Sequence, residues 1–268
     1  MTQRLSRWGG LVALAYASFS YAAFLAVFVY FILFTVGLLV PKTVDDGPSV
    51  SVAHALVVDC ALLLLFGVQH TVMARPAFKD RLLSVVPAAA ERSTFVLIAS
   101  LCLGLLVFAW APLPGALWHT DNALAVALLS SLCAGGWVLL LVSTFLIDHF
   151  ELFGLKQGWL RALRRERRES VFKKPALYRV VRHPMMLGFL LGFWATPHMT
   201  FSHLTLSVGM TLYILVGIAF EERDLVHRFG ASYLEYQRSV PKLFPWFHAR
   251  PEHGGRAAKI AVEARKHS

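Results

Sequence analysis

The sequence predicts an all-α integral membrane protein with about six transmembrane helices, both termini in the cytoplasm, and a cytoplasmic helical cap. Of its 268 residues, 57% are hydrophobic and only 16% are charged, whereas a soluble domain carries about 25% charged residues. The mean hydropathy is +0.58. The few charges lie almost entirely between long apolar runs, so we expect lipid to surround most of the chain.

Four apolar runs in the first 147 residues are each long enough to cross a bilayer. A hydrocarbon core of about 30 Å requires about 20 helical residues. The first run, from Trp8 to Pro41, holds no charged residue. It exceeds the roughly 7–15 apolar residues of a secretory signal, so we expect it to be retained. The other three runs cover residues 52–72, 93–111 and 122–147.

A fifth uncharged stretch runs from Pro184 to Phe220 and is interrupted at 195–198 by Ala-Thr-Pro-His. A single helix of that length would overshoot the bilayer, so the stretch predicts a helical hairpin whose halves are each short for a full crossing. The turn then lies either in the outer leaflet or inside the protein, as a re-entrant element whose backbone polar groups find partners.

The positions of the basic residues support this count of crossings. Of 26 Lys and Arg, 25 lie near the N-terminus, in the loops within 73–92 and 148–182, or after Phe220, and only Lys42 lies on the other side. Short loops rich in Lys and Arg stay cytoplasmic, so the pattern predicts six crossings with both ends inside. Topology and anionic lipids then explain the net charge of +10, without nucleic acid.

No repeat or linker separates a soluble domain, so residues 1–268 are predicted to form a single membrane domain. Cys60, Cys102 and Cys133 lie within apolar runs and have no metal-ligand spacing, so we expect neither a disulfide framework nor a metal site. The predicted parts are four transmembrane helices (1–147), a basic cytoplasmic segment (148–182) with a headgroup helix at Arg161–Arg168, a hairpin with a C-terminal motif (183–247), and a flexible basic tail (248–268).

Polar residues at four predicted helix ends share one depth, at the cytoplasmic face. A site there is wet enough for a charged ligand and close enough to lipid for an apolar one. The residues are His70, Asp148, His149, Arg182, His183, Glu221 and Glu222.

Two of these motifs have both a structural and a functional interpretation. Pro184 suits the first turn of a helix, so Arg182-His183-Pro184 is either a helix start or an anion-binding helix N-terminus. Glu221 and Glu222 would oppose the helix dipole if the helix ended there, but we expect it to continue and to stop at Gly230. The glutamates are then either solvated partners of nearby arginines or functional groups at the membrane boundary.

Together with the motifs that follow them, these residues carry a family resemblance. The order Arg182-His183-Pro184, Glu221-Glu222, Phe229-Gly230-x-x-Tyr233-x-x-Tyr236 and Val240-Pro241-x-Leu243-x-Pro245 resembles the isoprenylcysteine carboxyl methyltransferase-like, or NnrU-like, superfamily of integral membrane methyltransferases. Segments 69–79, 91–94, 143–155 and 193–197 extend the likeness and are similar to the bacterial methanethiol S-methyltransferase family.

The resemblance implies a cofactor, a reaction and a location. The cofactor would be S-adenosylmethionine, bound by the hairpin and C-terminal motif of 183–247. A Rossmann domain is not expected, since the sequence lacks the G-x-G-x-x-G motif. The reaction would transfer a methyl group to methanethiol, giving dimethyl sulfide and S-adenosylhomocysteine, at the cytoplasmic face of the bacterial inner membrane.

Eight residues of the C-terminal motifs are candidate cofactor ligands. An arginine would bind the carboxylate of the donor, a glutamate its ammonium group or ribose, backbone groups at the helix start would contact it, and tyrosines would close over it. These residues are Arg179, Arg182, His183, Pro184, Glu221, Glu222, Tyr233 and Tyr236.

A thiol acceptor reacts as a thiolate, and even free cysteine has a pKa of about 8.5, so a base near the sulfur is expected. His70 and His149 are the candidate catalytic bases, and each is otherwise a structural boundary residue. Asp148 either orients a histidine or accepts the proton itself. Met186 stands where prenylcysteine enzymes usually carry Tyr, and it would give a small thiol a soft apolar wall. Trp194 is a second candidate for the substrate pocket.

Two other functions stay open on the sequence. One keeps the cofactor and methylates another thiol, a lipid or a prenylated cysteine. The other is a non-catalytic membrane protein of nitrogen-oxide metabolism, against which the two paired motifs argue. The oligomeric state also stays open, and a chain of this size can act as a monomer.

Overall fold

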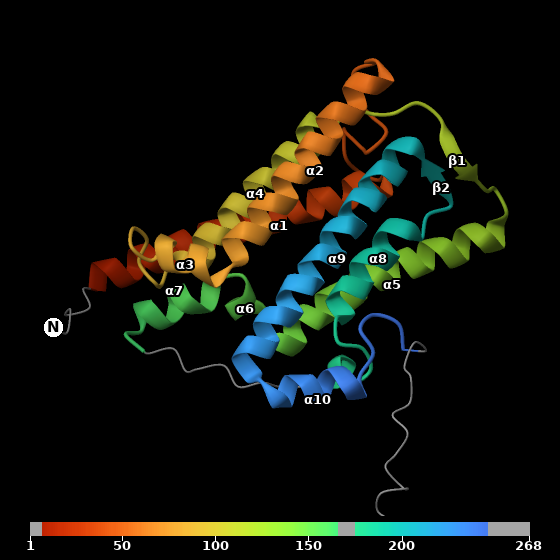
Figure 1. Ribbon diagram of the computed structural model, residues 1–268. Coiled ribbons are helices and arrows are strands. Elements are labelled where there is room, and N and C mark those ends of the chain that lie inside the picture. The colour runs from red at the N-terminus through yellow and green to blue at the C-terminus, as the bar shows by residue number, and fades with distance from the viewer. Residues whose placement is uncertain (1–6, 166–174, 246–268) are drawn as a thin grey trace, which may run out of the picture.

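The computed structural model describes residues 7–165 and 175–245. Helices dominate this part of the chain, and a two-stranded antiparallel ribbon is added at one end of the helices (Figure 1). The elements are α1 (Arg7–Val36), α2 (Val52–Ala74), α3 (Pro76–Leu82), α4 (Glu91–Ala109), β1 (Ala116–His119), α5 (Ala123–Ile147), α6 (His149–Leu152), α7 (Leu155–Ala162), the 3₁₀ helix η1 (Ala176–Arg179), α8 (Pro184–Trp194), β2 (His198–Thr200), α9 (Phe201–Phe229) and α10 (Ala231–Ser239).

Helices α1, α2, α4, α5 and α9 are long and apolar enough to cross a membrane. Each of them leaves large apolar side chains uncovered, which in water would be an unfavourable surface but in lipid is the expected one. Examples, one per helix, are Val12, Val57, Leu101, Leu124 and Leu212, each at least 60% exposed. The chain is therefore a multi-pass membrane protein.

The predicted hairpin exists, but its two halves are unequal. Helix α8 has 11 residues, which at 1.5 Å per residue gives about 16 Å, roughly half of a hydrocarbon core. Helix α9 has 29 residues and is long enough to cross. The expectation that both halves are short was thus wrong for α9, because the helix continues beyond the apolar stretch through Glu221 and Glu222.

The ends of both hairpin helices follow the predicted local chemistry. Pro184 occupies the first turn of α8, with His183 as the preceding cap residue. Helix α9 ends at Phe229, and the next residue, Gly230, has φ of +55°, a region that favours glycine. The predicted continuation past the twin glutamates and the stop at Gly230 are therefore confirmed.

Helices α5 and α8 approach so closely that only glycine fits between them. A Cβ atom added at Gly188 would lie 2.6 Å from the carbonyl oxygen of Gly136, and one added at Gly192 would lie 2.7 Å from the Trp137 ring. Small residues at such crossings let membrane helices pack backbone to backbone. This contact fixes the short helix α8, and with it the His183-Pro184 corner, against the longer helix α5.

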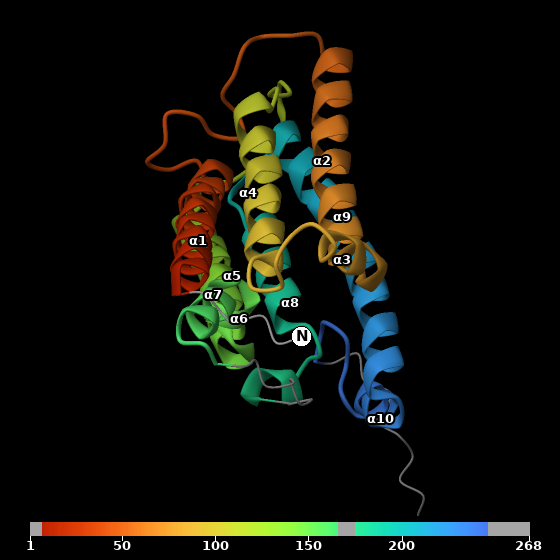
Figure 2. The same cartoon turned by 90° about the vertical axis from the view of Figure 1, so that its left-hand side faces the viewer.

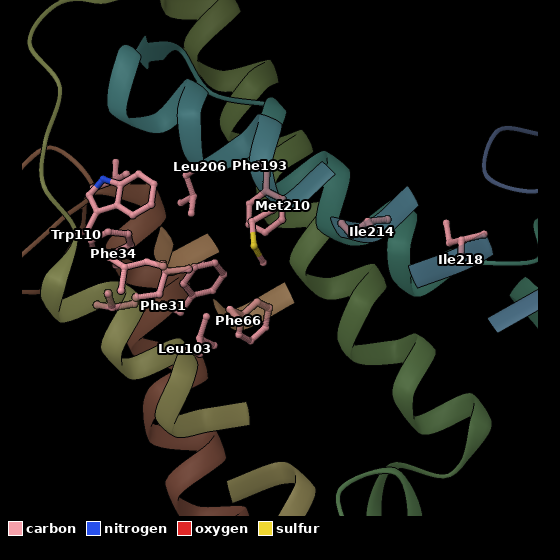
Figure 3. Close-up of a cluster of buried hydrophobic side chains, with 14 of the residues drawn as sticks. Phe31, Phe34, Phe66, Leu103, Trp110, Phe193, Leu206, Met210, Ile214 and Ile218 are labelled. Atoms are coloured by element: carbon pink, nitrogen blue, oxygen red, sulfur yellow. The ribbon is translucent and has the colours of Figure 1, made fainter. Parts of the chain in front are cut away.

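A buried aromatic and aliphatic cluster joins α1, α2, α4, α8 and α9 (Figure 3). Phe31 and Phe193 meet edge to face at 6.0 Å, an arrangement favoured by the ring quadrupoles. Met210 and Ile214 of α9 continue the cluster toward the other end of that helix. Close packing of this core sets where the polar ends of the helices come to lie.

The described loops separate into two ends. Helices α3, α6, α7 and α10 lie toward one end of the long helices (Figures 1 and 2), whereas β1 and β2 lie toward the other (Figure 1). Lys42 belongs to the second end, where its Nζ donates to the carbonyls of Phe108 and Trp110. The ribbon was not predicted. The tail 248–268 and residues 166–168 of the predicted headgroup helix lie outside the described residues. In its described part, Arg161 and Ala162 are the last residues of α7 and a turn follows at Leu163 and Arg164, so the helix predicted to begin at Arg161 instead ends there.

Candidate functional site

The histidine-proline corner and the twin-glutamate corner lie in contact. Arg182 forms an ion pair with Glu222, Nη2 to Oε1 at 2.8 Å, and its Nε donates to the same oxygen at 2.8 Å. The Nε2 atom of His183 lies 3.1 Å from Glu222 Oε1, and its Nδ1 lies 3.7 Å from Glu221 Oε2. The start of α8 is thereby joined to the far end of α9.

The same corner fixes the segment that follows α10. Arg182 Nη1 donates to the carbonyls of Gln237 and Val240, each at 2.8 Å. The backbone N–H of Arg182 donates to Pro241, and that of His183 donates to Lys242. These bonds occupy the guanidinium on several sides and connect α8, α9 and the C-terminal motif.

A cavity of about 780 Å³ opens beside this corner, between α2, α3, α4, α8 and α9. Small-molecule sites typically occupy about 300–1,000 Å³, so the cavity is large enough for a nucleoside-sized ligand. Its lining residues are His70, Thr71, Ala74, Arg75, Pro76, Lys79, Arg92, Phe95, Met186, Tyr213, Gly217, Glu221, Asp224, Leu225, His227 and Arg228.

One face of α9 forms a wall of the cavity. Tyr213, Gly217, Glu221, Asp224 and Arg228 follow one another at intervals of three or four residues, which places them on one stripe of a helix. From Tyr213 to Glu221 the stripe rises about 12 Å. It therefore changes from aromatic to charged between the interior and the end of the helix.

The deep part of the cavity is aromatic and holds a buried histidine. The ring of His70 lies 4.8 Å from that of Phe95 and 5.7 Å from that of Tyr213. Among the described residues, no group forms a hydrogen bond with His70 Nδ1. A buried imidazole nitrogen without a partner is costly, and it is a functional candidate because a ligand can supply the missing bond.

The mouth of the cavity is rich in cations. Arg75 binds Asp224 at 2.8 Å and lies over the Phe220 ring at 5.1 Å. Arg92 lies over Phe95 at 4.7 Å. Burial and the nearby Arg92 hold the pKa of Lys79 below its usual value. A concentration of positive charge at the mouth of a cavity favours an anionic group there.

Glu221 and Glu222 have different environments although they are adjacent. The side chain of Glu221 is 48% exposed and lines the cavity, whereas that of Glu222 is 11% exposed. Glu222 is surrounded by Arg182, His183 and Lys242, whose Nζ lies 3.6 Å from Oε2. Only Glu221 presents its carboxylate to the cavity.

Two of the predicted catalytic residues lie at a different junction, between α5, α6 and α7. Asp148 caps α6 by accepting from the N–H of Glu151 at 3.1 Å, and it pairs with Lys156. Burial opposes ionisation of Asp148, but the hydrogen bonds from Lys156 and Glu151 outweigh it and lower its pKa.

His149 completes this junction. It is hydrogen-bonded to the Tyr21 hydroxyl at 2.7 Å and the Thr144 hydroxyl at 2.8 Å, and it stacks on Phe145 at 4.2 Å. Both ring nitrogens therefore have partners. Neither His149 nor Asp148 belongs to the lining of the cavity that contains His70.

The remaining predicted residues are divided among the cavity lining, a cluster that packs on α9, and positions outside both. Met186 lines the cavity. Tyr233 and Tyr236 are buried in a small apolar cluster that packs α10 on α9. Arg179 is exposed in η1. Trp194 lies at the opposite end of α8 from His183, where its Nε1 donates to Thr211.

Tyr213, Gly217, Lys79 and Arg92 were not predicted as site residues. A signal for the first two exists in the sequence, because Tyr213 and Gly217 precede Glu221 by eight and four positions on one helical face. The basic residues were interpreted only as topology signals. Their contribution to a cavity depends on how α3 and α4 pack beside α9.

The fold and the cavity define a class of protein, a multi-pass helical membrane protein with a ligand-sized polar cavity at one end of its helices. The chain belongs to the NnrU protein family, whose family model matches residues 60–245. No solved structure matches the chain.

Several relatives share most of this chain. A methanethiol S-methyltransferase 2 of Bradyrhizobium diazoefficiens is 47% identical and covers 90% of this chain and 92% of its own. A methanethiol S-methyltransferase of Pseudomonas deceptionensis is 48% identical over 79% of this chain and 81% of its own. That of Mycobacterium tuberculosis is 45% identical over 88% of this chain and 97% of its own.

Proposed function

We propose that this protein transfers a methyl group from S-adenosylmethionine to methanethiol, giving dimethyl sulfide and S-adenosylhomocysteine. The observation that carries the proposal is a cavity with a cationic mouth and an aromatic floor, in which His70 Nδ1 lacks a partner among the described residues. Relatives that are 45–48% identical and carry the name methanethiol S-methyltransferase support the choice of reaction.

The donor set of the cavity fits S-adenosylmethionine. The ligand has a carboxylate, an ammonium group, ribose hydroxyls and an adenine, and the cavity volume of about 780 Å³ is adequate for them. Lys79 at the mouth would bind the carboxylate, together with the guanidinium of Arg92, whose Nε also donates to the Leu152 carbonyl at 2.6 Å. Glu221 would bind the ammonium group or the ribose, since its carboxylate faces the cavity.

When bound, the cofactor would supply a methyl group on a positively charged sulfur, and a thiolate would attack that carbon in line as S-adenosylhomocysteine leaves as a neutral thioether. His70 would accept the proton of the thiol at Nδ1, which has no hydrogen-bond partner in the part of the chain that the structure describes. The aromatic floor around Phe95 and Tyr213 would exclude water from the reacting sulfur. Opposite charges neutralise each other in this reaction, so a dry, low-dielectric floor favours the transition state over the separated ions.

The corner of Arg182, His183 and Glu222 would position the site without contacting the reacting atoms. It connects the start of α8 to α9 and to residues 240–242. Met186 follows two residues after Pro184 and lines the cavity, so displacement of the corner would move a wall of the site. Asp148 and His149 would have a similar structural role at the α5–α6–α7 junction.

We further propose that the cavity opens to the cytoplasm of a bacterial inner membrane. The mouth lies at the end of the helices where Arg75, Lys79 and Arg92 are found, and 25 of the 26 Lys and Arg belong to the segments assigned to that side. Basic residues at this end would also contact anionic lipid headgroups.

The test uses the purified full chain in lipid nanodiscs, S-adenosylmethionine with a labelled methyl group, and methanethiol. Label in volatile dimethyl sulfide, measured in the headspace, supports the proposal. Label in another thiol, a lipid or a prenylated cysteine, with none in dimethyl sulfide, would move the function to another acceptor. Failure to bind S-adenosylmethionine by calorimetry would exclude a methyltransferase.

A further inference from the structure

Gly217 occupies an unusual position on the cavity wall formed by α9. It lies one helical turn beyond Glu221 toward the interior and one turn before Tyr213. A Cβ atom added at Gly217 would meet no described atom within 4 Å. The missing side chain therefore leaves space that belongs to the cavity.

Neither packing nor backbone geometry requires glycine at this position. In the same helix, a Cβ atom at Gly209 would lie 2.5 Å from Leu63, so that glycine permits helix contact. Gly217 has no such neighbour among the atoms that the structure describes, and its φ is not in the left-handed region. Glycine is also one of the poorest helix formers. What distinguishes the position is that the open space beside it adjoins the cavity that Gly217 lines.

We infer that Gly217 keeps the acceptor chamber open, so that the absence of a side chain at this position sets how large an alkyl group the thiol can carry. The chamber is the deep part of the cavity, bounded by His70, Phe95, Met186 and Tyr213. This inference rests on the proposed function and adds a specificity-determining residue to it.

The position of Gly217 explains how a small side chain introduced there would lower the rate of methyl transfer. The donor is held on the Glu221 side, and the thiol is deprotonated on the His70 side. Gly217 lies between these levels on the α9 stripe. Reacting atoms must come within about 3–3.5 Å in line, so a side chain at 217 that pushes the alkyl group aside lowers the rate even where both ligands still bind.

The test compares Gly217→Ala and Gly217→Leu with the wild-type protein. The measurements are kcat/KM for methanethiol, ethanethiol and 1-propanethiol, and the Kd of S-adenosylmethionine. For Gly217→Ala we expect the ratio of kcat/KM for ethanethiol to that for methanethiol to fall about tenfold, the scale of one methylene in an apolar pocket. For Gly217→Leu we expect no measurable transfer to any of the three, with donor Kd within about twofold.

Gly135→Ala is the matched control. Gly135 lies in α5, a Cβ atom there also meets no described atom within 4 Å, and the residue does not line the cavity. The Gly135→Ala variant should have the same ratio of kcat/KM for ethanethiol to that for methanethiol as the wild type.

An unchanged thiol ratio in Gly217→Ala, or weaker donor binding in step with the rate, would overturn the inference. A wild-type protein that methylates none of the thiols would overturn the proposed function itself. The two failures are therefore distinguishable.

Discussion

Arg182 and Glu222 form a nearly buried ion pair, with side chains 9% and 11% exposed, that joins the start of α8 to α9 across 40 positions of the chain. The pair is completed by His183 and by the carbonyls of Gln237 and Val240. A buried pair that loses one partner leaves an uncompensated charge, and this costs about 3–5 kcal/mol. The corner is therefore expected to govern stability more than ligand contact.

Glu222→Gln should destabilise the fold, because it leaves the Arg182 guanidinium without its anion. We expect a loss of about 3 kcal/mol in the free energy of unfolding, measured by denaturant titration in detergent. Arg182→Met with Glu222→Met should recover part of that loss, since both charges are then absent. A stability of Glu222→Gln equal to that of the wild type would mean that the pair is not a structural element.

Glu221→Gln should weaken the binding of S-adenosylmethionine without affecting the fold. Its carboxylate is 48% exposed and faces the cavity, so its removal deletes an anion that the ligand ammonium or ribose would meet. A charge-assisted hydrogen bond contributes about 1.5–3 kcal/mol. Calorimetry with S-adenosylmethionine should therefore show a Kd at least tenfold higher at an unchanged melting temperature. Unaltered affinity would remove Glu221 from the donor site.

His70→Ala should slow methyl transfer in a manner that depends on pH. A positioned base contributes about 10²–10⁴ in rate, so we expect a loss of at least about 100-fold at pH 7 with donor affinity kept. The loss should shrink as the pH rises, because thiolate then forms in solution without the imidazole. A pH–rate profile parallel to that of the wild type would exclude a role in deprotonation.

His149→Ala is the comparison for His70→Ala. His149 is bonded to Tyr21 and Thr144 outside the cavity. It should lower the melting temperature while the rate per folded molecule stays near that of the wild type.

Lys79→Met should weaken donor binding and remove part of its alkaline pH dependence. Burial lowers the pKa of Lys79, as do Arg92 and, to a smaller extent, Arg75, whereas Glu91 and Asp224 partly oppose the shift. A carboxylate binds the protonated amine, so affinity is full below this lowered pKa and falls as the pH rises through it.

Arg81→Met is the control for Lys79→Met, because Arg81 is on the same helix but does not line the cavity. Titration calorimetry across neutral to alkaline pH measures both variants. Equal affinities of the two variants would place the carboxylate elsewhere.

Asp148→Asn should reduce stability above pH 4 only. Hydrogen bonds from Lys156 and Glu151 outweigh burial and hold the folded-state pKa below its usual value. A carboxyl with a lowered folded pKa stabilises the protein above the unfolded value of about 3.9, and this contribution disappears as the pH falls through the folded pKa.

We expect the melting temperature of Asp148→Asn to be about 2–4 °C below that of the wild type at pH 7. The difference is small because the Asp148–Lys156 pair is partly exposed. Differential scanning fluorimetry against pH measures it. A difference that persists well below pH 3 would contradict the assignment.

Sequence patterns determined the features that depend on contiguous residues. Apolar runs predicted the long helices. Pro184 predicted the start of α8, and Gly230 predicted the end of α9. The distribution of Lys and Arg distinguished the loops at the two ends of the helices. Motif order also gave the family and the two corners, which the structure places in contact. Each of these follows from local sterics, from helix periodicity or from the cost of charge in lipid.

Tertiary packing alone decided which of the polar residues share the cavity. His70 and His149 both lie at the same end of the helices. His70 lines the cavity, and its Nδ1 has no partner within residues 7–165 and 175–245, whereas His149 is hydrogen-bonded to two hydroxyls. The Arg182 guanidinium donates hydrogen bonds to the carbonyls of Gln237 and Val240, and no local sequence pattern specifies this contact. The physical reason is that a cavity is bounded by helices far apart in the chain, as in the contact of Arg75 with Asp224, and their approach depends on packing of the whole core.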